Sequence, residues 1–364
     1  MVKAKWKQIF PQKYSSSAAH EPCPRSSHGL SLARNGTCII LIGGEHIART
    51  PLDSSQCTWM AEKSHESTAS WKWRPICHVE EDLCPPARIG HSQAVINDKV
   101  YIFGGRQGIE MKEQALDDLW VLDCSGAIGT EAWSQVSTGA HKGPGPRSFH
   151  KMIAVGTDLY VFGGCGTGGR LADLYKFDTL QNKWEELGES LLRGRGGANL
   201  IHLPGKDGDG KLAVVAGFCG EESNDGHQYD LERGRQGWDP SLMDSSCLAN
   251  LRPRSVCVSG TIPSLGKAVI FGGEVNPSDR GHEGAGGFEN DIVILDASTG
   301  AMDQSDGSIL KQEPSASWPM SRGWTDGAVL DLEEKKCLYI FGGLAGDDSN
   351  PVRLGDLWEC DFSL

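Results

Sequence analysis

The sequence predicts an all-β protein, a six-bladed β-propeller whose ring is closed by an N-terminal strand. Three observations lead to this prediction. An apolar segment that ends in a glycine pair recurs six times, strand-like segments follow each copy, and the chain ends before the sixth repeat is complete. A repeat of about fifty residues that is rich in short strands is typical of propeller blades.

The recurring segment is a short apolar strand that ends in Gly-Gly or, once, in Ala-Gly. Its copies are IILIGGE (39–45), VYIFGGR (100–106), LYVFGGC (159–165), LAVVAGF (212–218), AVIFGGE (268–274) and LYIFGGL (338–344). Glycine adopts backbone dihedrals that other residues avoid and lets a neighbouring backbone approach closely. We therefore expect each pair to end strand b of its blade at a crowded point between blades.

Each repeat reads as four antiparallel strands. In the third repeat we expect strand a at 149–156, strand b at 159–164, strand c at 172–178 and strand d at 183–188. Strand c recurs at 117–123, 290–296 and 355–361. Strand d is marked by a tryptophan, at Trp71 or Trp73, Trp133, Trp184, Trp238 and Trp318. Large aromatic side chains at a repeated position favour packing between blades over ligand binding.

The two ends of the chain complete one blade together. The sixth repeat has no strand d of its own, whereas residues 3–9 have the strand-d pattern with Trp6 in place. We expect this segment to pair beside residues 355–361, which closes the ring and protects the sheet edges. Residues 1–364 then form one domain. It comprises a closing strand at 1–10 and blades near 24–77, 86–138, 146–188, 193–241, 252–319 and 321–364.

Composition excludes several classes of function. A net charge of −13 is unsuited to binding the nucleic-acid backbone, so no nucleic-acid partner is expected. No segment approaches eighteen consecutive apolar residues, so no membrane partner is expected either. The N-terminus lacks a secretory signal and the twelve cysteines are scattered, which favours a reducing, cytoplasmic location. The sequence does not decide between a monomer and a homodimer.

One face of the propeller carries the candidate site. Its b–c loops at 106–116 and 274–289 are long, and long loops in compact domains are usually functional. The same face receives one arginine from every repeat, at or just before strand a: Arg25, Arg88, Arg147, Arg195, Arg254 and Arg322. Six guanidinium groups around one mouth would suit an oxyanion, a carbonyl or a phenolate. Arginines that instead bond the neighbouring blade or a strand-c aspartate fit the pattern equally.

Aromatic side chains and an acidic loop complete this candidate site. Phe149, Phe218 and Trp324 lie near the arginines and are expected to form apolar walls. Glu274, Asp279 and His282 lie within nine residues of one another on the b–c loop of the fifth repeat. Carboxylates with imidazole are ligands of open ferrous sites. The same residues also fit a turn with a capping histidine, or acid–base groups that act without metal.

The segment GGEVNPSDRGHEGAGGFENDIVILD, with ARIGHS and the six glycine pairs, resembles plant and fungal kelch proteins related to specifier proteins. The resemblance covers the whole chain and identifies it as a divergent member. It implies a six-bladed propeller that redirects breakdown of a glucosinolate aglycone with ferrous iron held by Glu-x-x-x-Asp-x-x-x-His. Glu274 and His282 match the outer ligands, but Ser278 occupies the middle position and Asp279 is one residue late. Arg88 matches an arginine that is functional in the family.

We therefore expect a small-molecule enzyme of the lyase, isomerase or cyclase type that uses no cofactor. It would bind a reactive intermediate of secondary metabolism and steer a non-redox cyclisation or rearrangement, as pericyclases and hetero-Diels–Alderases do. Its candidate catalytic residues are Arg88, Arg147, Glu274 and His282. We expect orientation of the reacting groups and hydrogen bonds to the substrate to accelerate the reaction. Two alternatives stay open: an Fe(II)-dependent specifier that uses Glu274, Asp279 and His282, and a non-catalytic kelch scaffold that binds acidic peptides.

Overall fold

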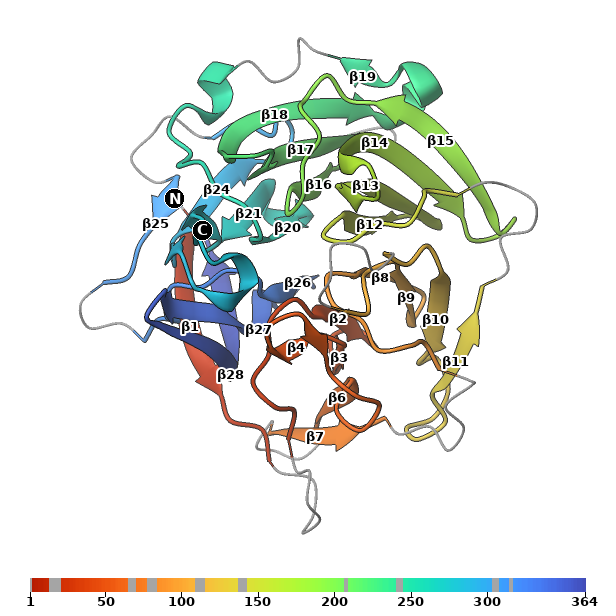
Figure 1. Ribbon diagram of the computed structural model, residues 1–364, viewed down its shortest axis with the longest axis vertical. Coiled ribbons are helices and arrows are strands. Elements are labelled where there is room, and N and C mark those ends of the chain that lie inside the picture. Colours follow the sequence, from red (N-terminus) through yellow and green to blue (C-terminus); the bar gives the residue numbers. More distant parts are fainter. Residues whose placement is uncertain are drawn as a thin grey trace.

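The structure is a computed structural model. It describes residues 2–12, 21–64, 70–76, 84–108, 115–136, 143–205, 209–239, 245–302, 308–313 and 317–364. Within these residues, six four-stranded antiparallel sheets surround a central axis (Figure 1). The innermost strands of successive sheets contact one another in a closed cycle. The predicted all-β, six-bladed propeller is confirmed.

Every blade has the predicted order, with strand a at the axis and strand d at the rim. Blade one contains β2 (Gly29–Ala33), β3 (Cys38–Ile42), β6 (Thr58–Lys63) and β7 (Trp71–Pro75). Blade two contains β8 (Ser92–Ile96), β9 (Lys99–Phe103), β10 (Leu119–Asp123) and β11 (Ala132–Gln135). Blade three contains β12 (Lys151–Val155), β13 (Asp158–Gly166), β14 (Gly169–Asp178) and β15 (Lys183–Glu189). Blade four contains β16 (Asn199–Leu203), β17 (Lys211–Phe218), β18 (Glu222–Asp230) and β19 (Trp238–Asp239). Blade five contains β20 (Val258–Ile262), β21 (Lys267–Phe271), β24 (Ile292–Asp296) and β25 (Ile309–Leu310). Blade six contains β26 (Asp326–Asp331), β27 (Lys336–Asp347), β28 (Asn350–Ser363) and β1 (Lys3–Ile9).

The remaining secondary structure is short. Two small hairpins extend b–c loops: β4 (Glu45–Ile47) with β5 (Thr50–Pro51), and β22 (Glu274–Asn276) with β23 (Gly287–Phe288). Short 3-10 helices lie at Leu231–Gln236, Ser245–Leu248, Pro263–Leu265 and Gly281–Glu283. No helix in the described part of the chain is long and apolar enough to cross a membrane.

The N-terminal strand closes the ring as predicted. β1 pairs antiparallel with β28, from Lys3 opposite Ser363 to Ile9 opposite Leu357, and the two strands lie side by side in Figure 1. Trp6 on β1 is 4% exposed, and its ring centroid lies 4.9 Å from that of Phe271 in blade five. The last blade thus combines both ends of the chain and buries its edge against its neighbour.

Strand-d tryptophans pack between blades, as expected. Trp73 of blade one contacts Phe341 of blade six, with ring centroids 5.7 Å apart. Trp184 of blade three contacts Phe103 of blade two at 5.3 Å. Each ring covers the apolar strand b of the preceding blade, where an aromatic side chain buries more area than any aliphatic one.

Blade five departs from this pattern, and the prediction for Trp318 is wrong. Strand d is β25 instead, and it pairs Ile309 and Leu310 with the start of β24. Trp318 follows later in the chain and donates its indole N–H to the Asn290 carbonyl at 2.6 Å. Its ring lies 6.0 Å from that of Trp6. A tryptophan in a longer connection therefore fills the blade interface while apolar residues upstream form the strand.

The glycine pairs are required by contact with the next blade. Gly104 has φ +62°, and a Cβ at this position would lie 2.7 Å from the Arg147 carbonyl oxygen of blade three. Gly105, with φ +95°, donates its N–H to that same carbonyl at 2.8 Å. The equivalent donor and acceptor recur between every pair of adjacent blades. Only glycine combines the left-handed dihedrals with this approach at little cost; Ala216 bears the strain in blade four, at φ +61°.

A second set of backbone hydrogen bonds runs around the axis. The residue two positions after each repeat arginine donates its N–H to the carbonyl of its counterpart in the preceding blade, over 2.6 to 3.1 Å. All six residues have positive φ, between 50° and 62°. They are Ser27, Gly90, Phe149, Gly197, Val256 and Trp324, and we call them the axial ring. The ring places one residue of each blade around the axis.

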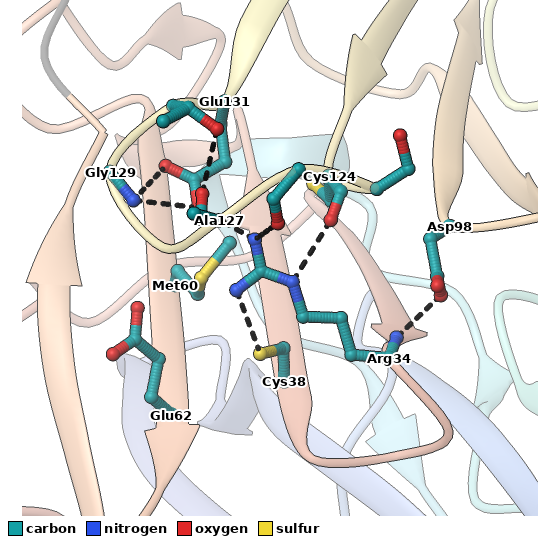
Figure 2. A network of polar contacts seen from close by, with 12 residues as sticks. Arg34, Cys38, Met60, Glu62, Asp98, Cys124, Ala127, Gly129 and Glu131 are labelled. Carbon is teal, nitrogen blue, oxygen red and sulfur yellow. Dashed lines mark hydrogen bonds and ion pairs between the residues drawn. The ribbon is translucent and has the colours of Figure 1, made fainter.

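A polar network joins blades one and two on the opposite face (Figure 2). The Arg34 guanidinium donates to the Cys124 carbonyl at 2.9 Å and pairs with Glu131 at 3.1 Å. Its backbone N–H donates to Asp98, and Arg74 pairs with the same Glu131 at 3.0 Å. One carboxylate thus accepts from two arginines of the neighbouring blade, a multidentate arrangement stronger than an isolated surface pair.

The closing strand should be essential for stability. Trp6→Ala removes a buried ring from the interface of blades five and six. It is expected to lower the free energy of unfolding by about 3–5 kcal/mol. Lys7→Ala on the exposed face of the same strand is the control, expected to change it by about 0.5 kcal/mol or less. Urea denaturation of both variants measures the difference. Equal unfolding midpoints would contradict a closing role for β1.

Candidate functional site

A cavity of about 440 Å³ opens on the predicted face, at the mouth of the channel where the b–c and d–a loops emerge. All six blades contribute to its lining. The walls are mostly apolar and include Ile89, Phe149, Phe218, Val256 and Trp324. Three of these, Phe149, Phe218 and Trp324, were expected from the sequence as walls, and the fold brings them together. Size and lining are those of a small-molecule site.

Two axial-ring residues form the floor of the cavity. Phe149 belongs to blade three and Trp324 to blade six, which are opposite in a ring of six. Their side chains nevertheless meet edge-to-face, with ring centroids 5.3 Å apart and planes at 84°. Gly90 provides the room, because a Cβ there would lie 2.6 Å from the Phe149 ring. Strand-a residues line a second cavity, of about 640 Å³.

Glu274 is the buried acid of the cavity. It follows the glycine pair of blade five directly, begins β22, and is only 6% exposed. Burial raises its pKa from an ordinary 4.5 to about 7, although hydrogen bonds from the Trp324 side chain and from the backbone of Ser278 and Gly286 oppose the rise. Near neutral pH this carboxyl is therefore divided between its acid and its carboxylate, as an acid–base group requires.

Three arginines that sequence reasoning did not select supply positive charge. Arg106, Arg170 and Arg49 come from blades two, three and one and line the cavity. Arg106 follows the glycine pair of its blade, and its Nε is buried without a hydrogen-bond partner in the described residues. The Arg170 guanidinium lies over the Phe218 ring, 4.6 Å from its centroid. The cavity thus combines apolar walls with cations.

A second carboxyl lies behind the cavity wall. Ser255, which lines the cavity, donates its hydroxyl to Glu222 Oε1 at 3.0 Å. Burial, with a smaller contribution from the nearby Glu274 charge, raises the pKa of Glu222 to about 8, although the Ser255 hydrogen bond opposes the rise. Two carboxyls with raised pKa values therefore lie in one region. Nothing in the sequence around residue 222 singled this residue out.

The six repeat arginines do not face the cavity, contrary to the first expectation. Each is 0–1% exposed. In blade two, Arg88 donates to the Pro86 and Gly104 carbonyls and forms a bidentate pair with Asp118 at 2.7 and 2.8 Å. Equivalent pairs join Arg147 to Asp173, Arg195 to Asp225, Arg254 to Asp291 and Arg322 to Asp356. Arg25 lies in the same place, but no carboxylate in the described part of the chain pairs with it. A buried guanidinium needs this neutralisation, so these side chains fasten strand c to the axis and are not exposed to a ligand.

The ferrous ligand set implied by the resemblance does not fit the described residues. Ser278 occupies the middle position, and its hydroxyl donates to Asp348 of blade six at 2.5 Å. Asp279, the substitute carboxylate, is exposed. The His282 side chain lies outside the described residues. Among the residues that the structure does describe, no group of three His, Cys, Asp or Glu side chains is placed to hold a metal ion.

Comparison with known proteins agrees with the repeat. The sequence profile of the KLHDC2/KLHL20/DRC7 Kelch-repeats domain matches residues 2–142 and 65–273. The chain belongs to the kelch-repeat family. This confirms the recognition made from the glycine-pair repeats.

Several kelch relatives resemble the chain over much of its length. N-(sulfonatooxy)prop-2-enimidothioate sulfolyase of Thlaspi arvense is 26% identical over 350 residues, 91% of each protein. Adagio protein 3 of Arabidopsis thaliana is 28% identical over 66% of this chain, which spans only 37% of that relative. A solved structure titled "Structure of YjhT" superposes with a TM-score of 0.60 over 93% of this chain and 95% of that one. At 15% identity, this likeness supports the fold alone.

One signal in the sequence could have found the missed arginine. The residue after each glycine pair differs from blade to blade: Glu45, Arg106, Cys165, Phe218, Glu274 and Leu344. Backbone bridges hold each of them beside the residue that follows the repeat arginine. The repeat arginine is the same in all six copies, whereas this position holds five residue types in six copies. Variation inside a repeat therefore marked the cavity better than the invariant arginines did.

The repeat arginines should be structural. Asp291→Ala leaves the buried Arg254 without its carboxylate and is expected to lower the free energy of unfolding by about 3–5 kcal/mol. Glu221→Ala breaks the exposed pair with Arg193 and is the control, expected to cost about 1 kcal/mol or less. Chemical denaturation measures both. A change for Asp291→Ala no larger than the control's would contradict the structural role.

The raised pKa of Glu274 predicts a pH dependence of stability. Between pH of about 4.5 and about 7, folded protein holds a proton on Glu274 that the unfolded chain has released. Stability from this group is therefore present at low pH and lost as pH rises through about 7. Relative to Glu274→Gln, the wild type should lose about 2–3 kcal/mol across this window, as measured by urea denaturation at each pH. A constant difference between the two proteins would contradict the raised pKa.

Proposed function

We propose that this kelch propeller is a small-molecule enzyme of the lyase or isomerase type. It binds an apolar organic intermediate that bears an acidic or carbonyl oxygen and steers its non-redox cyclisation or rearrangement. One observation carries the proposal: a buried carboxyl with a pKa of about 7 faces an apolar cavity whose walls also contain arginines. Catalytic sites characteristically combine such perturbed groups with a largely apolar pocket.

The cavity would orient the two ends of such a substrate. Phe149, Trp324 and Val256 offer an apolar floor to a hydrocarbon part. Arg106 and Arg170, on the side of blades two and three, offer guanidinium donors to oxygen atoms. A substrate with both parts is held in one orientation, and productive orientation alone lowers a barrier by about 7–11 kcal/mol in well-oriented model systems.

Glu274 supplies the polarising group. In its acid form it donates a hydrogen bond to the carbonyl oxygen of an electron-poor intermediate such as a quinone methide, which stabilises negative charge developing there. In a cycloaddition, one carbon–carbon and one carbon–oxygen bond form from existing π bonds, and nothing leaves. This reaction consumes no oxidant and requires neither a metal nor a covalent nucleophile. Glu274 replaces Arg88 and Arg147 as the central catalytic residue of the proposal, with Arg106 beside it.

A lyase reaction is the second candidate. The name of the Thlaspi arvense relative describes a sulfolyase whose substrate carries a sulfonatooxy group, and the similarity covers 91% of this chain. Elimination of an oxyanion also uses cations to stabilise the leaving group and an acid to protonate a forming atom. Arg106, Arg170 and Glu274 offer both. The buried repeat arginines, by contrast, offer nothing to an acidic peptide, so the scaffold alternative receives no support from them.

A cyclisation assay tests the proposal. An ortho-quinone methide released in buffer with an electron-rich alkene gives a racemic cycloadduct without protein. The wild type should give enantiomeric excess, because a chiral pocket orients both partners. Glu274→Gln and Arg106→Ala should each reduce the protein-dependent rate about 100-fold, as loss of one oxyanion donor does. Arg193→Ala, an exposed arginine of blade four outside the cavity, should behave as wild type. Racemic product with wild-type protein would exclude this reaction class for the probe pair.

Chelation separates this proposal from the ferrous alternative. Because Ser278 is bonded to Asp348 and Asp279 is exposed, activity should be unchanged in excess EDTA and should not rise when ferrous iron is added anaerobically. Isothermal titration with Fe(II) should show the same heats for wild type and Glu274→Gln. Saturable Fe(II) binding that is lost in Glu274→Gln would instead support the Fe(II)-dependent specifier alternative.

A further inference from the structure

Blade one breaks the arginine–aspartate rule that holds in the other five blades. Arg25 is 0% exposed, yet no carboxylate of the described residues pairs with it. It donates instead to the Gly43 carbonyl at 2.9 Å and the Gln56 carbonyl at 2.8 Å. Burial lowers the pKa of Arg25 to about 10. Burial of a guanidinium without an anionic partner costs folding free energy, so the surroundings of Arg25 need a physical explanation.

Cys57 occupies the place of the missing aspartate. In blades two and five the first glycine of the pair donates its N–H to the carbonyl of Asp118 and Asp291; in blade one Gly43 donates in the same way to Cys57, at 2.7 Å. The next residue, Thr58, pairs with Ile42 as Leu119 pairs with Phe103. Position 57 is therefore the one from which a side chain reaches the arginine in other blades.

The sulfur of a second cysteine, Cys23, already contacts the Arg25 guanidinium. Arg25 Nη2 donates to Cys23 Sγ over 3.6 Å, and Arg25 Nε donates to the Cys23 carbonyl at 3.2 Å. In blade two, the equivalent Nη2 contacts the aspartate carboxylate at 2.8 Å. The Cys57 thiol now points toward Thr58 Oγ1, at 3.4 Å. Cys57 already lies close enough to act electrostatically on the Arg25 guanidinium, and rotation about its χ1 moves its sulfur between staggered positions beside that group.

We propose that Cys23 and Cys57 form an oxidation site beside the Arg25 guanidinium, in which the two sulfurs join as a disulfide. A thiolate at Cys23 attacks a peroxide oxygen: a sulfur–oxygen bond forms, the oxygen–oxygen bond breaks, and hydroxide leaves as water after protonation. The Cys57 thiolate then attacks that sulfur, the sulfur–sulfur bond forms, and a second water leaves. Two thiols are oxidised and one peroxide is reduced to two waters. The site is separate from the cavity and independent of the proposed function.

Peptide mapping tests the inference on the folded protein. Wild type is treated with hydrogen peroxide, remaining thiols are blocked with N-ethylmaleimide, and the protein is digested with trypsin under non-reducing conditions. The expected product is a linked pair of peptides 14–25 and 50–63, two hydrogens lighter than their sum. Dithiothreitol should separate them. Cys247→Ser, which alters a partly exposed cysteine of another blade, should give the same link.

Two results would overturn the proposal. One is recovery of both peptides with the blocking group attached after peroxide treatment. The other is a link from peptide 50–63 to peptide 73–88, which contains Cys77 and Cys84, because Cys57 would then pair with one of these and not with Cys23. Cys57→Asp provides a second measurement. It should raise the melting temperature of the reduced protein by restoring the ion pair of the other blades, and peroxide should leave Cys23 of this variant without a disulfide partner. An unchanged or lower melting temperature would contradict the equivalence of position 57 with the aspartates.

Discussion

Contact between successive blades at the axis is the constraint on which the rest of the structure depends. Two backbone hydrogen bonds recur at every junction: one links the axial-ring residues, and the other runs from the second glycine to the arginine carbonyl of the next blade. Both need left-handed dihedrals, and the second needs a residue without a Cβ at the point of closest approach. The second glycine and the repeat arginine both serve this junction, which explains why they recur through six otherwise different repeats.

The same junction creates the site. Because the backbone of the axial ring is held by its own hydrogen bonds, its side chains are free to differ, and in this chain they include Phe149, Val256 and Trp324. The position after each glycine pair lies beside them and supplies Arg106 and Glu274. A repetitive scaffold thus presents a non-repetitive pocket. Rigid backbone around variable side chains is what a catalytic constellation requires.

Buried charge separates the structural residues from the functional ones. Five repeat arginines are neutralised by an aspartate of their own blade, so their charge holds the fold and is closed to ligands. Among the residues that the structure describes, Glu274 has no cationic partner of that kind, and burial leaves it close to half protonated near neutral pH. Arg25 is the intermediate case, a buried cation whose expected carboxylate is replaced by a thiol. Departures from the repeat, and not the repeat itself, mark where chemistry is proposed.

The sequence by itself determined the six blades, their strand order, the closing strand and the face that carries the site, because each rests on local strand patterns and on turns that repeat. It also identified Phe149, Phe218, Trp324 and Glu274 as cavity residues. Only the tertiary structure decided that the six arginines are buried, that Trp318 lies outside strand d, and that Arg106 and Arg170 face the cavity. Those outcomes depend on which side chains meet when the strands and blades are folded together and on which groups are excluded from water, and the strand and turn patterns of the sequence specify neither.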